Sequence, residues 1–159
     1  MIIISNVIAF LLISYIANSF LSSKYSKNKY LAILFIFITL ESFINHTGAS
    51  PFKGIFLLIM YFLYVFIQFE GKPIQKIMII VPFFLIQVIS EILVAFCLNN
   101  ILFIEITRNA FSHGFLLGTI FSNTILAIFV FFYVRILKLI QADNLPKYTW
   151  LALILPIIS

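Results

Sequence analysis

Apolar residues run through this chain in long stretches that short polar segments separate. Five stretches cover residues 2–21, 30–44, 54–69, 77–98 and 114–134, and a sixth begins at 148 and reaches Ser159. The hydrocarbon core of a bilayer is about 30 Å thick, and a helix needs roughly 20 apolar residues to cross it. We therefore predict an all-α, polytopic transmembrane bundle over residues 1–159, with five complete spans. The sixth run, 148–159, is too short for a span, so we expect a fragment of a longer protein.

The basic residues between these runs alternate in number from one loop to the next. The five loops carry three, one, two, one and three of them: Lys24, Lys27, Lys29; Lys53; Lys72, Lys76; Arg108; Arg135, Lys138, Lys147. Short loops rich in Lys and Arg stay on the cytoplasmic side of a membrane. The alternation predicts a multi-pass protein of the cell membrane with its N-terminus outside.

The composition supports a membrane location and narrows the choice of partners. Hydrophobic residues make up 64% of the chain and charged residues 9%, whereas soluble domains carry about a quarter charged residues. The net charge of +5 gathers on the predicted inner side, where anionic lipid headgroups lie. We therefore expect a lipid bilayer as partner and no nucleic acid. The single cysteine, Cys97, excludes an internal disulfide and a multi-cysteine metal site.

Glu91 is the most informative polar residue in the apolar runs. It lies in the outer half of the fourth run, about 20 Å from the inner end at the rise of an α-helix. An ionisable group at such depth marks a functional site by default. Gln87 is one turn away and Ser90 is adjacent, so one face of this helix is polar. Two interpretations stay open: Glu91 contacts a ligand, or it is protonated or paired with Arg108 or a neighbouring helix for a structural reason.

Other ionisable residues gather on the predicted outer side. Glu105 and Arg108 are three residues apart, and we interpret them as an ordinary helical ion pair. His46 and His113 lie in outer loops, where we expect them to be solvated because no spacing suggests a metal-ligand pair. We predict no metal and no cofactor in this segment. The candidate ligand-contact or switch residues are Glu41, Gln87, Glu91, Arg108 and His113.

Small residues recur at every fourth position where the fifth run begins. They are Ala110, Gly114, Gly118 and Ser122. Such a stripe lets another helix approach closely. We interpret Gly114, Gly118 and Ser122 as helix-packing residues within the monomer, with a dimer seam as the alternative. Thr119 and Asn123 lie near the same face and are able to hydrogen-bond across it.

Known catalytic signatures are absent from the sequence. It holds no Walker A motif, no Gly-x-Ser-x-Gly and no His-Glu-x-x-His. A membrane cysteine protease that processes peptide pheromones would need a cysteine and a histidine facing each other, and we would expect them on the cytoplasmic side. Because Cys97 and both histidines are predicted on the outer side, we reject that activity and assign no catalytic residue.

Three segments together resemble a known family. They are the span and basic turn from Phe62 to Ile77, the Val88-Ile-Ser-Glu-Ile stretch, and the segment from Leu145 to Ser159, which opens with Leu-Pro-Lys-Tyr-Thr-Trp. They resemble the membrane sensor region of Agr-type sensor histidine kinases of Gram-positive bacteria, whose ATPase domain belongs to the GHKL superfamily. In that family an outside N-terminus precedes six or seven spans, a dimerisation helix with the phosphoacceptor histidine, and the ATP-binding domain.

The resemblance implies a role in two-component signal transduction and quorum sensing. The expected partners are an extracellular signal, often a secreted peptide, a second copy in a full-length homodimer, and a response regulator. ATP and Mg belong to the kinase domain, of which these residues contain no part. Six spans from an outside N-terminus end outside, so a cytoplasmic kinase requires a seventh span after Ser159.

Two other functions remain open from the sequence. One is a small transporter or substrate-binding membrane subunit in which Gln87 and Glu91 line a pathway. The other is a bundle with a structural or assembly role. A transporter should carry its polar stripe on to the inner side, whereas a receptor should continue past Ser159 into a kinase domain.

Overall fold

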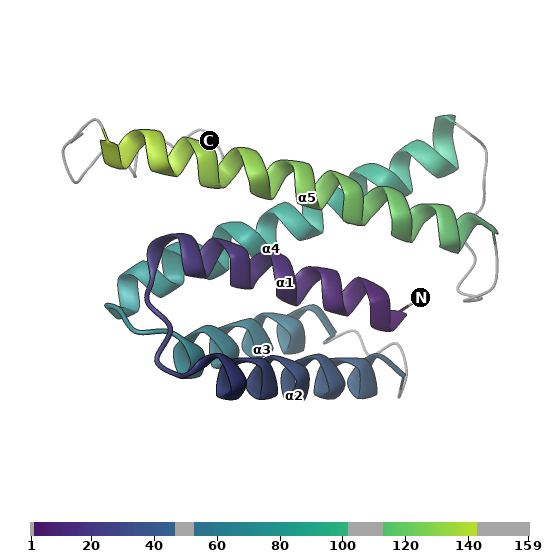
Figure 1. The fold of residues 1–159 in the computed structure, drawn as a ribbon. Helices are drawn as coiled ribbons and strands as arrows, with labels where there is room; N and C mark the ends of the chain where they lie inside the picture. Colours follow the sequence, from purple (N-terminus) through teal and green to yellow (C-terminus); the bar gives the residue numbers. More distant parts are fainter. Residues whose placement is uncertain (1, 47–52, 102–112, 143–159) are drawn as a thin grey trace.

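The computed structural model describes residues 2–46, 53–101 and 113–142, and these form a bundle of helices (Figure 1). The helices are α1 (Ile2–Phe20), α2 (Lys27–His46), α3 (Lys53–Gln68), α4 (Pro73–Phe96) and α5 (His113–Ala142). A short π-helix, η1 (Cys97–Ile101), continues α4. The described ranges contain no strand, and the all-α prediction is confirmed there.

Three of these helices are long and apolar enough to cross a membrane. The qualifying segments are Ile3–Phe20 in α1, Pro73–Ile101 in α4 and η1, and Gly114–Leu139 in α5. The apolar part of α3, Gly54–Gln68, is shorter. α2 has 20 residues but includes Lys27, Lys29 and Glu41. By length and composition, three of the described helices are therefore candidates to span a membrane, and the five complete spans stay a prediction. The sixth run, 148–159, lies outside the described residues.

The helix boundaries differ from the predicted runs because helices extend into polar sequence. α2 begins at Lys27 rather than Tyr30, and α4 begins at Pro73 rather than Ile77. Proline suits the first turn of a helix, where its missing N–H costs no hydrogen bond. α5 continues eight residues past the predicted end at Val134, to Ala142.

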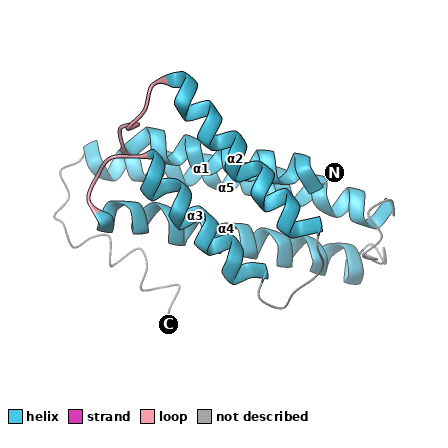
Figure 2. Cartoon of the chain, turned by 90° about the horizontal axis from the view of Figure 1, so that it is seen from below, coloured by secondary structure: helices cyan, strands magenta, loops and turns pink. Residues whose placement is uncertain are grey.

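Successive helices run in opposite directions, and α1 is central. α1 contacts α2, α3, α4 and α5, while α3 contacts α4 and α2, and α5 contacts α4 (Figures 1 and 2). The connections α1–α2 and α3–α4 lie at one end of the bundle together with the C-terminus of α5 (Figure 1). We call this the basic end, because it holds the Lys and Arg residues of these segments: Lys24, Lys27, Lys29, Lys72, Lys76, Arg135 and Lys138.

The two connections at the basic end are joined to each other. The backbone N–H of Lys24 donates to the carbonyl of Gln68 at 3.0 Å, and that of Glu70 donates to the carbonyl of Ser22 at 2.8 Å. Gly71 makes the turn with a φ of 138°, and a Cβ there would lie 2.7 Å from the side chain of Leu21. A residue other than glycine would therefore be strained at this turn.

The C-terminal end of α3 is capped by two ammonium groups. Lys24 Nζ and Lys76 Nζ donate to the carbonyl oxygen of Phe66 at 3.0 Å and 3.4 Å. Cations stabilise this end of a helix because its last carbonyls carry partial negative charge. Lys76 Nζ also lies 4.8 Å from the centre of the Phe66 ring, in the geometry of a cation–π contact.

The core is built around aromatic rings in the middle of the bundle. Phe10 of α1 is fully buried and makes edge-on contacts with Tyr61 and Tyr64 of α3, at centroid distances of 5.5 and 5.2 Å. Tyr61 in turn meets Phe83 of α4 at 5.2 Å. Edge-to-face pairs of this kind add to the stabilisation from burial. This layer of rings separates the two ends of the bundle.

Candidate functional site

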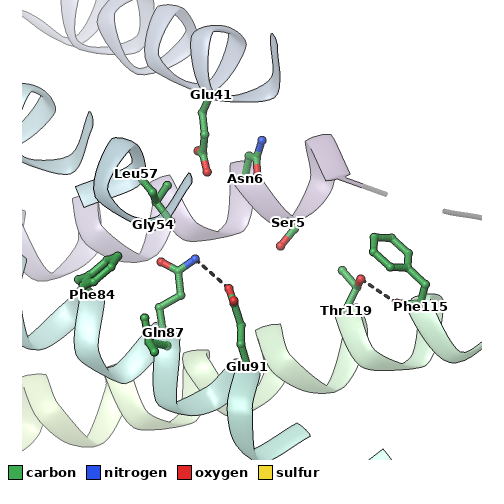
Figure 3. A pocket seen from close by; sticks show the side chains of 11 residues that line it. Ser5, Asn6, Glu41, Gly54, Leu57, Phe84, Gln87, Glu91, Phe115 and Thr119 are labelled. Atoms are coloured by element: carbon green, nitrogen blue, oxygen red, sulfur yellow. Dashed lines mark hydrogen bonds between the residues drawn. The ribbon is translucent and has the colours of Figure 1, made fainter. Parts of the chain in front are cut away.

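A polar cavity lies toward the end of the bundle opposite the basic end, and every α-helix of the bundle contributes to its wall (Figure 3). Its volume is about 250 Å³. The lining residues are Ser5 and Asn6 from α1, Glu41 from α2, Gly54 and Leu57 from α3, Phe84, Gln87, Val88 and Glu91 from α4, and Phe115 and Thr119 from α5. Because five helices share this wall, a shift of any one of them changes its shape.

A chain of hydrogen bonds runs from the core into the cavity. The hydroxyl of Tyr61, which is fully buried, donates to Gln87 Oε1 at 2.8 Å. Gln87 Nε2 donates to Glu91 Oε1 at 3.3 Å, one helical turn further along α4 (Figure 3). Tyr61 therefore sets the orientation of the Gln87 amide, and the amide group holds the carboxylate of Glu91.

The cavity has a second carboxylate on its opposite side. Glu41 of α2 points toward the space into which Gln87 and Glu91 of α4 also point (Figure 3). Only 5% of Glu41 is exposed, whereas Glu91 is exposed. Of the two carboxylates, Glu91 is thus the one that reaches the surface, and Glu41 lies inside the bundle.

Amide and hydroxyl groups tie α1 to the helices beside the cavity. Asn6 Nδ2 donates to Ser42 Oγ of α2 at 3.1 Å. Asn123 Nδ2 of α5 donates to Ser5 Oγ at 3.1 Å, and Ser5 Oγ lies 3.3 Å from Asn123 Oδ1. α1 is therefore linked to α2 and α5 at the depth of the cavity. The hydroxyl of Thr119 donates within its own helix, to the carbonyl of Phe115 at 2.8 Å.

The structure brings three of the five candidate residues together. Glu41, Gln87 and Glu91 line the same cavity. Arg108 lies outside the described residues, and so does any pairing of Arg108 with Glu91 or Glu105. His113 is the first residue of α5, and its side chain lies outside the described part, as does that of His46.

Sequence reasoning missed several residues of the cavity. Ser5 and Asn6 are polar residues near the start of the first apolar run, which placed them at the predicted outer side, but nothing indicated which helix they would face. Tyr61 is one of seven tyrosines, and its sequence neighbourhood carries no signal for a bond to Gln87. Only the packing of α1 and α3 against α4 makes these residues part of one site.

The small residues of α5 lie on its inward side. Gly114 is buried, and Gly118 and Ser122 are half-buried. The same four-residue spacing continues through Leu126, Val130 and Val134, each 2% exposed or less. α5 contacts α4 and α1, so this stripe follows the face that packs inside the bundle. The alternative, a dimer seam along this stripe, stays a prediction.

A second group of polar side chains meets the aromatic layer at Tyr64 and extends from it toward the basic end. Ser14 Oγ and Tyr64 Oη are 2.6 Å apart, and Asn18 Nδ2 donates to Tyr30 Oη at 3.0 Å. The hydroxyl of Tyr64 lies 3.5 Å from that of Tyr30 and donates to it. Along α1, polar residues therefore occur on both sides of Phe10, at the cavity and toward the basic end.

The described residues hold no group of three or more His, Cys, Asp and Glu side chains arranged to bind a metal ion. What the cavity offers is two carboxylates, two amides and two hydroxyls beside apolar wall, which is an arrangement for binding by hydrogen bonds and charge. Comparison with protein-family models, with curated proteins and with solved structures finds no match.

Proposed function

We propose that this chain is the membrane-embedded sensor region of a two-component sensor histidine kinase of the Agr-type, GHKL group. In this proposal the five-helix cavity recognises an extracellular signal and the bundle relays its binding to a cytoplasmic kinase domain. The observation that carries the proposal is the convergence of Glu41, Gln87 and Glu91 in one cavity to which all five α-helices contribute. A site shared by every helix is suited to convert binding into a movement of helices.

The distribution of charge supports the orientation that a receptor needs. The basic end carries most of the Lys and Arg residues, and such loops stay in the cytoplasm. The cavity at the other end then faces outside, as does the N-terminus, and the protein resides in the cell membrane. The proposal assigns homodimerisation, ATP, Mg and the response regulator to the kinase domain after Ser159, with a seventh span between them.

The proposal is tested on the full-length protein. Its reading frame must continue past Ser159 into a histidine-kinase domain, and a frame without one contradicts the receptor function. With the protein in nanodiscs, transfer of labelled phosphate from ATP is measured against increasing amounts of the peptide fraction from the medium of the producing cells. We expect a saturable change in the rate.

A matched pair of variants tests whether the response of the kinase to the signal depends on the cavity. Glu91→Gln removes the charge at the cavity, and we expect it to shift the half-maximal dose by about 10-fold, the equivalent of 1.4 kcal/mol in binding. Glu70→Gln removes an exposed carboxylate at the basic end and should leave the dose unchanged. An unchanged dose response in Glu91→Gln removes this residue from the signal site.

A second function, a small transporter or substrate-binding membrane subunit, is favoured by the polar group at Ser14, Tyr64 and Tyr30. This group carries hydrogen-bonding side chains from the aromatic layer toward the basic end. If this chain is a transporter, the chain alone must take up a substrate when it is placed in liposomes. Uptake that Ser14→Ala and Glu91→Gln both lower would replace the receptor proposal.

A further inference from the structure

We propose that the ammonium groups of Lys24 and Lys76, at the basic end, bind the phosphate of one anionic phospholipid whose acyl chains lie along α3. This site is separate from the cavity, and it does not depend on the sensor function. It also differs from a general attraction between basic loops and a membrane surface, because two side chains from different parts of the chain meet at it.

The two ammonium groups converge on a single atom. Lys24 comes from the α1–α2 connection and Lys76 from the start of α4, and both nitrogens lie within 3.4 Å of the carbonyl oxygen of Phe66. The α1–α2 and α3–α4 connections are hydrogen-bonded to each other, which keeps the pair together (Figure 2). An ammonium group has three N–H donors, so the shared carbonyl leaves donors on both groups for an anion. Lys24 is exposed and Lys76 is 5% exposed, so a phosphate reaches the pair from the side of Lys24.

The charge of this pair is not balanced by the carboxylates near it. The described part of the basic end contains seven Lys and Arg residues and one carboxylate, that of Glu70. Lys24 repels Lys76 more strongly than Glu70 attracts it. A phosphate between the two ammonium groups attracts both of them and accepts charge-assisted hydrogen bonds from both. The pair therefore has the chemistry of an anion site.

An apolar strip on α3 favours a lipid over a free phosphate. Ile59, Leu63 and Ile67 recur at every fourth position and are 46%, 48% and 41% exposed. Residues four apart lie on one face of a helix, so the strip runs along α3 and ends beside Phe66, whose carbonyl binds both lysines. A headgroup at the lysines places acyl chains next to this strip, whereas a free phosphate gains nothing from it.

The length of α3 brings headgroups toward the same place. Its apolar part, Gly54–Gln68, is about 22 Å long at the helical rise, whereas the hydrocarbon core of a bilayer is about 30 Å thick. A short apolar helix thins the bilayer around it, and basic side chains at its end extend toward the headgroups. Both responses bring lipid phosphates close to Lys24 and Lys76.

Lipid binding to the full-length protein in detergent micelles tests the inference directly. Native mass spectrometry compares dioleoylphosphatidylglycerol, which is anionic, with dioleoylphosphatidylcholine, which has the same acyl chains and no net charge. We expect the first bound lipid to be held at least about 10-fold more tightly when it is the anionic one. Equal binding of the two lipids overturns the inference.

Substitutions distinguish a shared site from a general effect of surface charge. Lys24→Gln and Lys76→Gln should each weaken binding of dioleoylphosphatidylglycerol about 10-fold and leave dioleoylphosphatidylcholine unchanged. Lys138→Gln removes an exposed charge of the same end, on α5, and should have an effect below about 2-fold because salt screens charges outside the site. Lys24→Arg keeps the charge and should keep the preference. The helical circular dichroism spectrum confirms that each variant is folded.

The two lysines should also be coupled, because they bind one phosphate. After Lys24→Gln, Lys76→Gln should cost distinctly less affinity than it does in the unchanged protein. Independent losses at Lys24 and Lys76, or equal losses at Lys24, Lys76 and Lys138, would show separate surface charges and overturn the shared site.

A soluble probe distinguishes the two sources of the phosphate. Glycerol phosphate has the headgroup phosphate without acyl chains, and we expect it to bind at least about 10-fold more weakly than dioleoylphosphatidylglycerol. Ile67→Ser, on the apolar strip, should weaken the lipid and leave glycerol phosphate unaffected. If glycerol phosphate binds as tightly as the lipid, the ligand is a free phosphate compound and the assignment to a lipid is wrong.

Discussion

The hydroxyl of Tyr133 in α5 donates a hydrogen bond of 2.9 Å to the backbone carbonyl of Met78 in α4. Met78 lies four residues before Pro82, which is inside α4. Proline has no N–H, so the carbonyl of Met78 lacks the donor that a helix normally supplies. Tyr133 provides that donor from the neighbouring helix. The carbonyl that Pro82 leaves without a donor in α4 thus accepts a hydrogen bond from α5. This bond links α5 to the helix that carries Gln87 and Glu91.

Removing the hydroxyl of Tyr133 should weaken the contact between α5 and α4. Tyr133→Phe leaves the Met78 carbonyl without its donor, and interhelical hydrogen bonds in membranes contribute about 0.6 kcal/mol on average and up to about 1.7. We expect the free energy of unfolding to fall by about 1 kcal/mol, measured by reversible unfolding in mixed micelles with SDS. Tyr15→Phe, at a residue that is 45% exposed on α1, should change it little.

A double-mutant cycle connects the effect to proline. In Pro82→Ala the restored N–H is able to bond the Met78 carbonyl within α4, so Tyr133→Phe should then cost distinctly less than it does beside Pro82. The same loss in both backgrounds would show that the Tyr133 hydroxyl acts through something other than the carbonyl freed by Pro82.

The aromatic layer should dominate the stability of the bundle. Phe10 is fully buried and contacts rings of α2 and α3, among them Phe37 and Tyr64. Phe10→Ala leaves a cavity, and we expect a loss of about 3–5 kcal/mol in the free energy of unfolding. Phe35→Ala makes the same change at a ring that is 70% exposed and should cost far less. Similar losses at the two positions would contradict the packing described for α1, α2 and α3.

The small residues of α5 should act within the monomer. Gly114→Leu places a large side chain on the buried face of α5, and overpacking of this kind typically costs about 1–3 kcal/mol. Thr124→Leu also adds a large apolar side chain to α5, on its exposed side, and should be tolerated. Both variants are compared by unfolding and by cross-linking. If Gly114→Leu keeps its stability but loses a cross-linked dimer, the stripe is a dimer seam instead.

The sequence predicted the helices and part of the site for clear physical reasons. Long apolar runs identify α1, α4 and α5, and the cost of burying an ion in lipid singles out Glu91. The bond from Tyr61 to Gln87 could not be predicted, because it depends on how α3 packs against α4. The same holds for Tyr133 and Met78: Pro82 shows that a carbonyl is freed, but not which helix supplies the donor.

The boundaries of α2 and α4 were missed for a different reason. Apolar runs predict what lies in lipid, whereas a helix continues through polar residues until its backbone turns. Lys27 and Pro73 therefore belong to helices although they precede the apolar runs.

The central requirement of the proposed function is that the cavity, which Glu41 and Glu91 line, opens to the outside of the cell. It is tested most directly by the reactivity of a cysteine at Thr119, which lines the cavity, introduced in a Cys97→Ser background. Membrane-impermeant methanethiosulfonates of opposite charge are applied to intact cells and to inverted membrane vesicles. Tyr25→Cys, in the exposed connection at the basic end, serves as the control and should react only in inverted vesicles.

We expect the cysteine at position 119 to react in intact cells, and the cationic reagent to react about 10-fold faster than the anionic one, a difference equal to about 1.4 kcal/mol. Glu91→Gln should reduce that ratio. Labelling of position 119 only in inverted vesicles, or equal rates with the two reagents, would contradict an outward-facing cavity lined by Glu41 and Glu91.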